Sequence, residues 1–116
     1  MSKDTCSVNI FDPKKVEKVK SFLTDDTETL FLADFFKTLS DQTRLKIVQS
    51  LIIEELCVCD LAEIVKVSIS AVSHQLRILR DKNIVKYRRQ GKMAYYSIVD
   101  EHINQIINLV QVHISE

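Results

Sequence analysis

Residues 68–98 read SISAVSHQLRILRDKNIVKYRRQGKMAYYSI, and this stretch decides the fold. Its first half has the apolar spacing of an α-helix, with Ser70 as the expected N-cap and an end near residues 82–83. A shorter helix is expected at 58–65, and the two helices together predict a helix-turn-helix over 58–82. An ordinary helical hairpin would show the same spacing, so this pattern alone leaves DNA binding open.

The second half of the stretch predicts a β-hairpin over 84–98, which would be the wing of a winged helix. Two strand-like runs flank a turn at 89–92 that contains Gly91, the only glycine of the chain. Glycine readily adopts the positive φ of a hairpin turn. The tip, RRQGK, carries three positive charges for which we expect no structural need. Contacts with DNA phosphates would explain these charges, whereas a solvated turn is the alternative.

Charge is unevenly distributed along the chain. The whole sequence has sixteen basic and sixteen acidic side chains, so its net charge is zero. Residues 66–92, however, contain eight basic residues and one acid, Asp81, which gives this segment a charge of +7 and the remainder −7. Such a separation favours a surface that faces a polyanion on an otherwise acidic body.

The composition favours one small domain that is mainly α with a small β-hairpin. The chain has 116 residues, 46% of them hydrophobic, with one glycine and one proline, so helices should dominate. We therefore expect a single winged-helix DNA-binding domain over 1–116, with a flexible arm at 1–11. Before the helix-turn-helix, a helix is expected at 12–23, with Asp12 as its N-cap and Pro13 at its first position. Further helices are expected at 27–39 and from the caps Ser40 and Asp41 onward.

Nothing in the chain predicts contact with a membrane. No apolar run approaches the ~20 residues that a spanning helix needs, and the first ten residues lack the apolar core of a signal peptide. We therefore expect a cytoplasmic protein. Its three cysteines would stay reduced there, as core filler, reactive thiols or metal ligands.

A last helix is expected over 100–115, with Asp100 as its cap. Its apolar residues form one stripe: Ile103, Ile106, Ile107, Val110 and Ile114. An amphipathic helix beyond a complete winged domain needs a surface to pack against, and a second copy of the chain would supply one. We therefore predict a homodimer through the N- and C-terminal helices, which suits a palindromic DNA site.

The same helix carries His102 and His113, which share one helical face. They lie roughly 16 Å apart along the axis, too far for one ion to bind both within one chain. In an antiparallel helix pair, Asp100 and His102 of one chain would meet His113 and Glu116 of the other. Two nitrogens and two carboxylates would make a four-coordinate Zn(II) site, although an exposed polar edge is the alternative.

Residues 55–65 read ELCVCDLAEIV and place Cys57 and Cys59 at a helix start. The helix dipole favours thiolate there, and Cys6 on the arm is the obvious third ligand. Three thiolates suit soft or large ions such as Cd(II), Pb(II) or Bi(III). Core packing and a thiol redox switch are the alternatives.

Together these segments resemble the ArsR/SmtB family of metal-responsive winged-helix repressors, most closely its CadC-type cadmium, lead and zinc sensors. Two motifs carry the resemblance: ELCVCDLA at 55–62, and D-x-H-x10-H-x2-E at 100–116. The resemblance covers nearly the whole chain. It implies a homodimeric repressor, not an enzyme, that leaves operator DNA when Cd(II), Pb(II) or Zn(II) binds and so derepresses metal efflux or resistance genes.

The resemblance also implies residue roles. Cys57 and Cys59 would bind metal together with Cys6 of the other chain. The DNA-binding residues on or before the recognition helix would be Ser68, Ser70, Ser73, His74, Gln75 and Arg77, and those of the wing Arg88, Arg89 and Lys92. Gln75 could read adenine and Arg77 guanine or phosphate, whereas His74 could instead be structural.

One departure concerns the thiolate site. Ile10 stands where four-thiolate members of the family carry a second arm cysteine. The site would then keep three thiolates or recruit an oxygen, which suits Pb(II) better than Cd(II). We take the thiolate site as the main sensor, and the terminal-helix site as a Zn(II) site with a lesser or separate role.

Two other functions stay open. A thiol redox-sensing repressor could use the same scaffold. A small metal-dependent enzyme is the other alternative, but the terminal-helix set leaves no open coordination position, and no nucleophile–base pair is evident.

Overall fold

The computed structural model describes residues 11–116, so Cys6 and Ile10 lie outside the described residues. These residues form two compact units, one ending at Leu32 and one over Ala33–Glu116, and each is considered by itself. No helix within 11–116 is long and apolar enough to cross a membrane.

The first unit contains helix α1 (Pro13–Phe22) and the beginning of α2 (Asp26–Leu39). Asp12 is the N-cap of α1, as predicted: its Oδ1 accepts a hydrogen bond from the backbone N–H of Lys14 at 3.0 Å. Proline follows at the first helical position, where its missing N–H has no cost. None of the α1 residues is buried.

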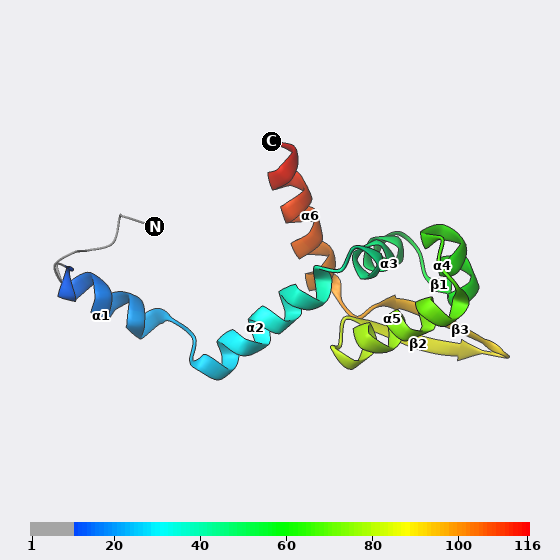
Figure 1. The fold of residues 1–116 in the computed structure, drawn as a ribbon, viewed down its shortest axis with the longest axis horizontal. Coiled ribbons are helices and arrows are strands. Elements are labelled where there is room, and N and C mark those ends of the chain that lie inside the picture. The colour runs from blue at the N-terminus through cyan, green and yellow to red at the C-terminus, as the bar shows by residue number, and fades with distance from the viewer. Residues whose placement is uncertain (1–10) are drawn as a thin grey trace. The chain divides into compact units, whose positions relative to one another are not determined.

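The second unit is a winged helix-turn-helix, which confirms the predicted fold class (Figure 1). Helices α4 and α5 form the helix-turn-helix, and β2 with β3 form the wing. After the end of α2 its elements follow in this order: α3 (Gln42–Ile53), β1 (Leu56–Cys57), α4 (Val58–Val65), α5 (Ile69–Asp81), β2 (Val85–Gln90), β3 (Met93–Ile98) and α6 (Glu101–Ser115).

The core of this unit lies among α3, α4, α5 and the sheet. Its fully buried side chains are Ile47, Val48, Leu61, Val72, Leu76, Leu79, Ile84 and Val85. The three that α5 supplies share one helical face, as their spacing predicts. Burial of that face leaves the opposite face of α5 exposed to solvent.

Helix α5 begins earlier than predicted. Its N-cap is Ser68, whose hydroxyl accepts a hydrogen bond from the N–H of Ala71 at 3.1 Å. The expectation of a cap at Ser70 is therefore wrong, and Ser70 lies in the first turn. Both serines are chemically able to cap, but only Ser68 has the extended backbone that brings its side chain to the free amides.

The end of α5 sets the direction of the wing. Asn83 adopts a left-handed conformation with φ 58°, which asparagine tolerates. The N–H of Ile84 then donates to the carbonyl of Leu79 at 2.9 Å, and the N–H of Asn83 donates to that of Arg80 at 2.9 Å. This is a Schellman motif, and its flanking residues Leu79 and Ile84 are both buried. The first residues of the wing are thereby fixed against α5, the predicted recognition helix.

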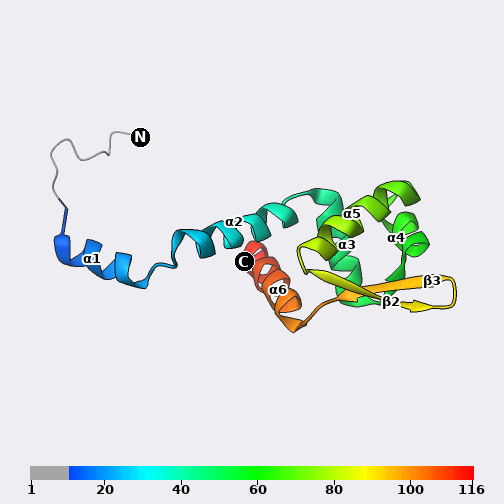
Figure 2. The same cartoon turned by 90° about the horizontal axis from the view of Figure 1, so that it is seen from below.

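The wing belongs to a three-stranded antiparallel sheet of order β1-β3-β2, and Figure 2 shows its two longer strands, β2 and β3, side by side. Strand β1 was not predicted, because two residues are too few to show an alternating pattern. It pairs Leu56 with Tyr96 and Cys57 with Tyr95. Strand β2 also continues to Gln90, two residues beyond the expected end, so only Gly91 and Lys92 form the loop.

Gly91→Val is expected to destabilise the hairpin. Gly91 has φ +62°, and an added side chain would meet no atom within 4 Å, so the backbone and not crowding sets the cost. We expect a loss of about 1–2 kcal/mol in the free energy of unfolding, measured by urea denaturation. Gly91→Asn is the matched control and should cost less, because asparagine tolerates this conformation. Equal losses for both variants would contradict the backbone explanation.

Candidate DNA-binding and metal-binding sites

The exposed face of α5 carries four of the predicted DNA-contacting residues: Ser70, Ser73, His74 and Arg77. They project away from the core because the opposite face of the helix is buried. The exposure of His74 argues against the alternative that it is a structural histidine of the helix pair. These four side chains are free to approach a groove of DNA.

Gln75 differs from its neighbours on α5 because its side chain is already bound. It is half-buried, and its Oε1 accepts a hydrogen bond from Nη1 of Arg44 at 3.1 Å. Arg44 is itself held by a bond from its Nε to the carbonyl of Thr38 at 2.8 Å. Reading adenine needs both the carbonyl and the amide of a glutamine. The bond from Arg44 uses one of the two lone pairs of Oε1, so the predicted contact of Gln75 with adenine would have to use the other.

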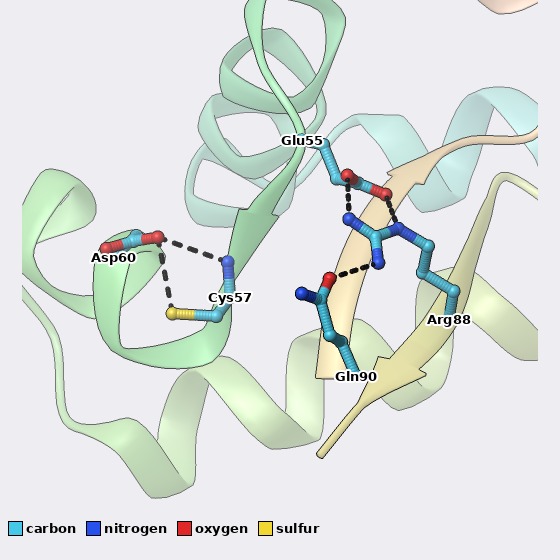
Figure 3. Close-up of polar contacts among 5 residues, drawn as sticks. All are labelled: Glu55, Cys57, Asp60, Arg88 and Gln90. Carbon is cyan, nitrogen blue, oxygen red and sulfur yellow. Dashed lines mark hydrogen bonds and ion pairs between the residues drawn. The ribbon is translucent and has the colours of Figure 1, made fainter. Parts of the chain in front are cut away.

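The positive charges at the wing are not equivalent. Arg88 forms a bidentate ion pair with Glu55: its Nε lies 2.9 Å from Oε2 and its Nη2 lies 2.8 Å from Oε1 (Figure 3). A third bond runs from Nη1 to Oε1 of Gln90 at 2.8 Å. The expectation that the tip charges have no structural need is therefore wrong for Arg88. Hydrogen bonding to Arg88 lowers the pKa of the Glu55 carboxyl, and the same bonding raises the pKa of Arg88.

Two arginines, Arg80 and Arg89, lie against the ring of Tyr87. The guanidinium carbon of Arg80, from α5, lies 5.1 Å from the ring centre, and that of Arg89, from β2, lies 5.9 Å from it. Such contacts hold a cation in place while leaving its N–H groups available to phosphate. Arg80 was not among the predicted DNA-binding residues. The basic segment at 66–92 was the available signal, but charge alone does not say which face a residue occupies.

The cysteine pair lies where the sheet meets α4. Cys57 ends β1 and is the N-cap of α4, and only 6% of it is exposed, whereas Cys59 in the first turn is exposed. The Sγ of Cys57 lies 3.2 Å from Oδ2 of Asp60, which also accepts the N–H of Cys57 at 3.3 Å (Figure 3). The predicted placement of both thiols at a helix start is confirmed. Asp60 was missed, although its position in ELCVCDLA was visible in the sequence.

These side chains fit part of a site for a soft metal ion. Cys57 and Cys59 line a pocket of about 230 Å³ together with Lys92 and Met93 of the wing. Two thiolates and the Asp60 carboxylate would offer sulfur and oxygen donors. Within residues 11–116 no three ligand side chains lie close enough to hold an ion by themselves. A complete set therefore requires another ligand, and the predicted one, Cys6, lies outside the described residues.

The predicted ligands at the start of α6 lie together. Asp100 is the N-cap, and its Oδ1 accepts the backbone N–H of His102 at 3.0 Å. The same oxygen lies 3.3 Å from Nδ1 of the His102 ring, whose side chain is 83% exposed. His113 and Glu116 are exposed at the other end of the helix. Their meeting across two chains stays a prediction.

Comparison with known proteins identifies the family. Residues 41–87 match the family model described as "Bacterial regulatory protein, arsR family". A cadmium resistance transcriptional regulatory protein of Staphylococcus aureus, a CadC homolog, is 43% identical over 114 residues, which cover 97% of this chain and 93% of that protein. The chain belongs to the ArsR family. The family assignment confirms that it is a DNA-binding transcriptional regulator and not an enzyme.

Two further relatives agree with this assignment. A transcriptional repressor SmtB homolog of Synechocystis is 42% identical over 111 residues, 96% of this ArsR-family chain and 84% of that protein. A solution structure from Mycobacterium bovis, described as a homodimeric winged helix-turn-helix DNA-binding domain, superposes with a TM-score of 0.72 at 29% identity. It covers 82% of this chain and 90% of the other.

Proposed function

We propose that this ArsR-family chain is a metal-sensing repressor that binds operator double-stranded DNA as a homodimer. Cd(II), Pb(II) or Zn(II) would release it and derepress metal efflux or resistance genes. One observation carries the proposal: Cys57 lies in the strand that pairs with wing strand β3, and its pocket borders Lys92 at the wing tip. An ion bound to the cysteines would therefore lie against the element that contacts DNA.

The proposed sensor set consists of Cys57 and Cys59 of one chain with Cys6 of the partner subunit. Ile10 leaves this set one thiolate short of four, and Asp60 is the nearest described oxygen donor to Cys57. Thiolates select soft ions, and a carboxylate adds an oxygen ligand that Zn(II) and Cd(II) also accept. The printed names of the Staphylococcus and Synechocystis relatives support a repressor that responds to metal.

The proposed dimer rests on an apolar surface of the second unit. The end of α2, α3 and α6 line a pocket of about 350 Å³, with Phe36, Leu45, Ile107 and Val110 in its wall. Ile114 at the end of the same stripe is 73% exposed. A second copy would remove this surface from water. The homodimeric description of the Mycobacterium bovis neighbour supports this arrangement.

The terminal helices would carry a second ion in this dimer. Asp100 and His102 of one chain, with His113 and Glu116 of the partner subunit, would form a four-coordinate Zn(II) site. The convergence of Asp100 and His102 in the described chain supports their half of the set. We assign this site a lesser or separate role, because the cysteine pocket borders Lys92 at the tip of the wing, whereas Asp100 and His102 follow the opposite end of β3.

The proposed regulation is a coupling between two binding events. If an ion weakens DNA binding, DNA must weaken ion binding by the same factor. The two recognition helices of a dimer must match half-sites ~34 Å apart, so a small change in subunit placement costs contacts on both sides. Ligands drawn from two chains make that placement sensitive to the ion.

A metal titration tests this proposal. The DNA probe is an operator duplex selected from a random library, and its release is followed by fluorescence anisotropy. Thiolate-to-metal ultraviolet absorption is recorded in parallel. We expect Cd(II) to raise the dissociation constant of the DNA complex by about 5- to 150-fold as the absorption saturates. Saturation without any change in DNA affinity would contradict a metal sensor. Release by peroxide without metal, with a disulfide detected by mass, would instead favour the redox alternative.

A further inference from the structure

The Glu55–Arg88 ion pair joins two parts of the winged domain that are 33 residues apart in the chain. Glu55 directly precedes β1, and Arg88 lies on β2, so the pair spans β3, which separates those two strands. Arg88 also lies over the ring of Tyr95 on β3, with its guanidinium carbon 5.0 Å from the ring centre. Contacts with Gln90 on its own strand, with Tyr95 on β3 and with the residue before β1 therefore hold this arginine in place.

The contacts occupy three of the five N–H groups that an arginine can offer to phosphate. A guanidinium recognises an oxyanion through parallel N–H bonds from one edge. In Arg88 the edge formed by Nε and Nη2 is bound to the Glu55 carboxylate, and Nη1 is bound to Gln90 (Figure 3). The ring of Tyr95 covers one face. A DNA phosphate could not bind this edge unless Glu55 first released it.

The other two charges of the wing tip, RRQGK, have no such partner. Within the part of the chain that the structure describes, neither Arg89 nor Lys92 forms an ion pair with a carboxylate. The guanidinium of Arg89 lies over the ring of Tyr87, and Lys92 lies in the hairpin loop. The tip at 88–92 therefore presents two positive charges that are available to phosphate, and a third, Arg88, that is bound to Glu55.

We propose that Glu55 is a latch that withholds Arg88 from DNA phosphate and so lowers the affinity of the wing for DNA. The inference rests on the proposed contact between wing and DNA, and adds a residue that opposes it. The ion pair is solvent-accessible, with 52% of the Arg88 side chain and 35% of the Glu55 side chain exposed. Exposed pairs of this kind are weak enough to open, so the latch sets affinity without preventing binding.

The latch also lies beside the proposed sensor. Cys57 pairs with Tyr95, and Tyr95 pairs with Arg88, so the three residues form one row across the sheet. Glu55 is separated from Cys57 by Leu56 alone. Glu55 thus directly precedes the short strand that carries the buried thiol.

The test measures DNA affinity of the full-length, metal-free protein for the selected operator duplex. Glu55→Gln should bind about threefold more tightly per wing, or about tenfold for a dimer, because Arg88 becomes available to phosphate. The dependence of affinity on salt should steepen by about one counterion per wing. In the double variant Glu55→Gln with Arg88→Gln, the gain should disappear.

Glu54→Gln is the matched control, because it removes the same charge one residue away from Glu55. Among the described residues, the Glu54 side chain forms no ion pair. Its affinity should stay close to that of the unmodified protein. The latch is overturned if Glu55→Gln binds no more tightly than Glu54→Gln, or if the gain persists without Arg88. Lys92→Gln distinguishes a failure of the Glu55 proposal from a failure of the proposed function. Weaker DNA binding by Lys92→Gln would support contact between the wing and DNA, whichever result Glu55→Gln gives. Unchanged binding of Lys92→Gln and Arg89→Gln would instead refute the wing contact itself.

Discussion

Cys57→Ser is expected to abolish the release of operator DNA by Cd(II). A serine hydroxyl is a hard, protonated group that binds soft ions poorly, so the ligand set would lose a donor. The substitution is otherwise mild. The hydroxyl can donate to Asp60 as the Cys57 thiol does at 3.2 Å, and the N–H bond of this residue to Asp60 is unaffected. The metal-free variant should therefore fold and bind DNA normally, while the effect of Cd(II) on DNA affinity falls from many-fold to about onefold.

His113→Ala is the matched comparison for the second proposed site. His113 is exposed on α6, far along the chain from the cysteine pocket, so its loss should leave Cd(II)-driven release intact. Both variants are measured by anisotropy with the same duplex, and metal binding is followed by ultraviolet absorption. If the serine variant still leaves DNA while the alanine variant does not, the terminal helix is the regulatory site and our assignment is reversed.

Leu79→Ala is expected to be the most destabilising single substitution considered. Leu79 is fully buried on the core face of α5, and its carbonyl accepts the N–H of Ile84 that ends the helix. Truncation removes buried methyl groups and leaves a cavity between the recognition helix and the wing. We expect a loss of about 2–5 kcal/mol in the free energy of unfolding, which is a large share of the stability of a small domain.

The measurement is urea denaturation followed by circular dichroism at one fixed protein concentration, because dimerisation would otherwise change the apparent stability. Ile53→Ala is the control, since 82% of Ile53 is exposed at the end of α3. It should cost no more than about 0.5 kcal/mol. A loss of under about 1 kcal/mol for Leu79→Ala would mean that the core around α5 relaxes into the cavity.

The wing charges limit what sequence reasoning could say about the DNA-binding surface. RRQGK reads as one basic tip, yet only some of its charges are available. Arg88 is bound to Glu55, whereas Arg89 lies over the ring of Tyr87, which leaves its N–H groups available. The difference arises because β1 pairs with β3, which brings Glu55, the residue before β1, within reach of Arg88 on β2, and this pairing is not a local property. Because β1 has only two residues, its sequence shows no alternating pattern that could predict a strand.

The cysteine site could be predicted only in part, because the burial of each thiol depends on tertiary contacts. The spacing of Cys57 and Cys59 before an apolar run correctly placed both at a helix start. It could not tell that Cys57 is also the last residue of a strand, and is buried while Cys59 is exposed. Cys57 is buried because α4 and β3 pack around it, whereas Cys59, two residues further on in the first turn of α4, faces solvent.

The sequence by itself determined the elements whose signals are local. The spacing of the apolar residues in α5, the cap at Asp12 and the single glycine at 91 each act within a few residues, so their outcome is readable without the fold. The tertiary structure alone decided which polar groups are free. Gln75 meets Arg44 from 31 residues away, and Arg88 meets Glu55 from 33 residues away. A side chain's availability to DNA depends on partners that only the folded chain brings within hydrogen-bonding distance.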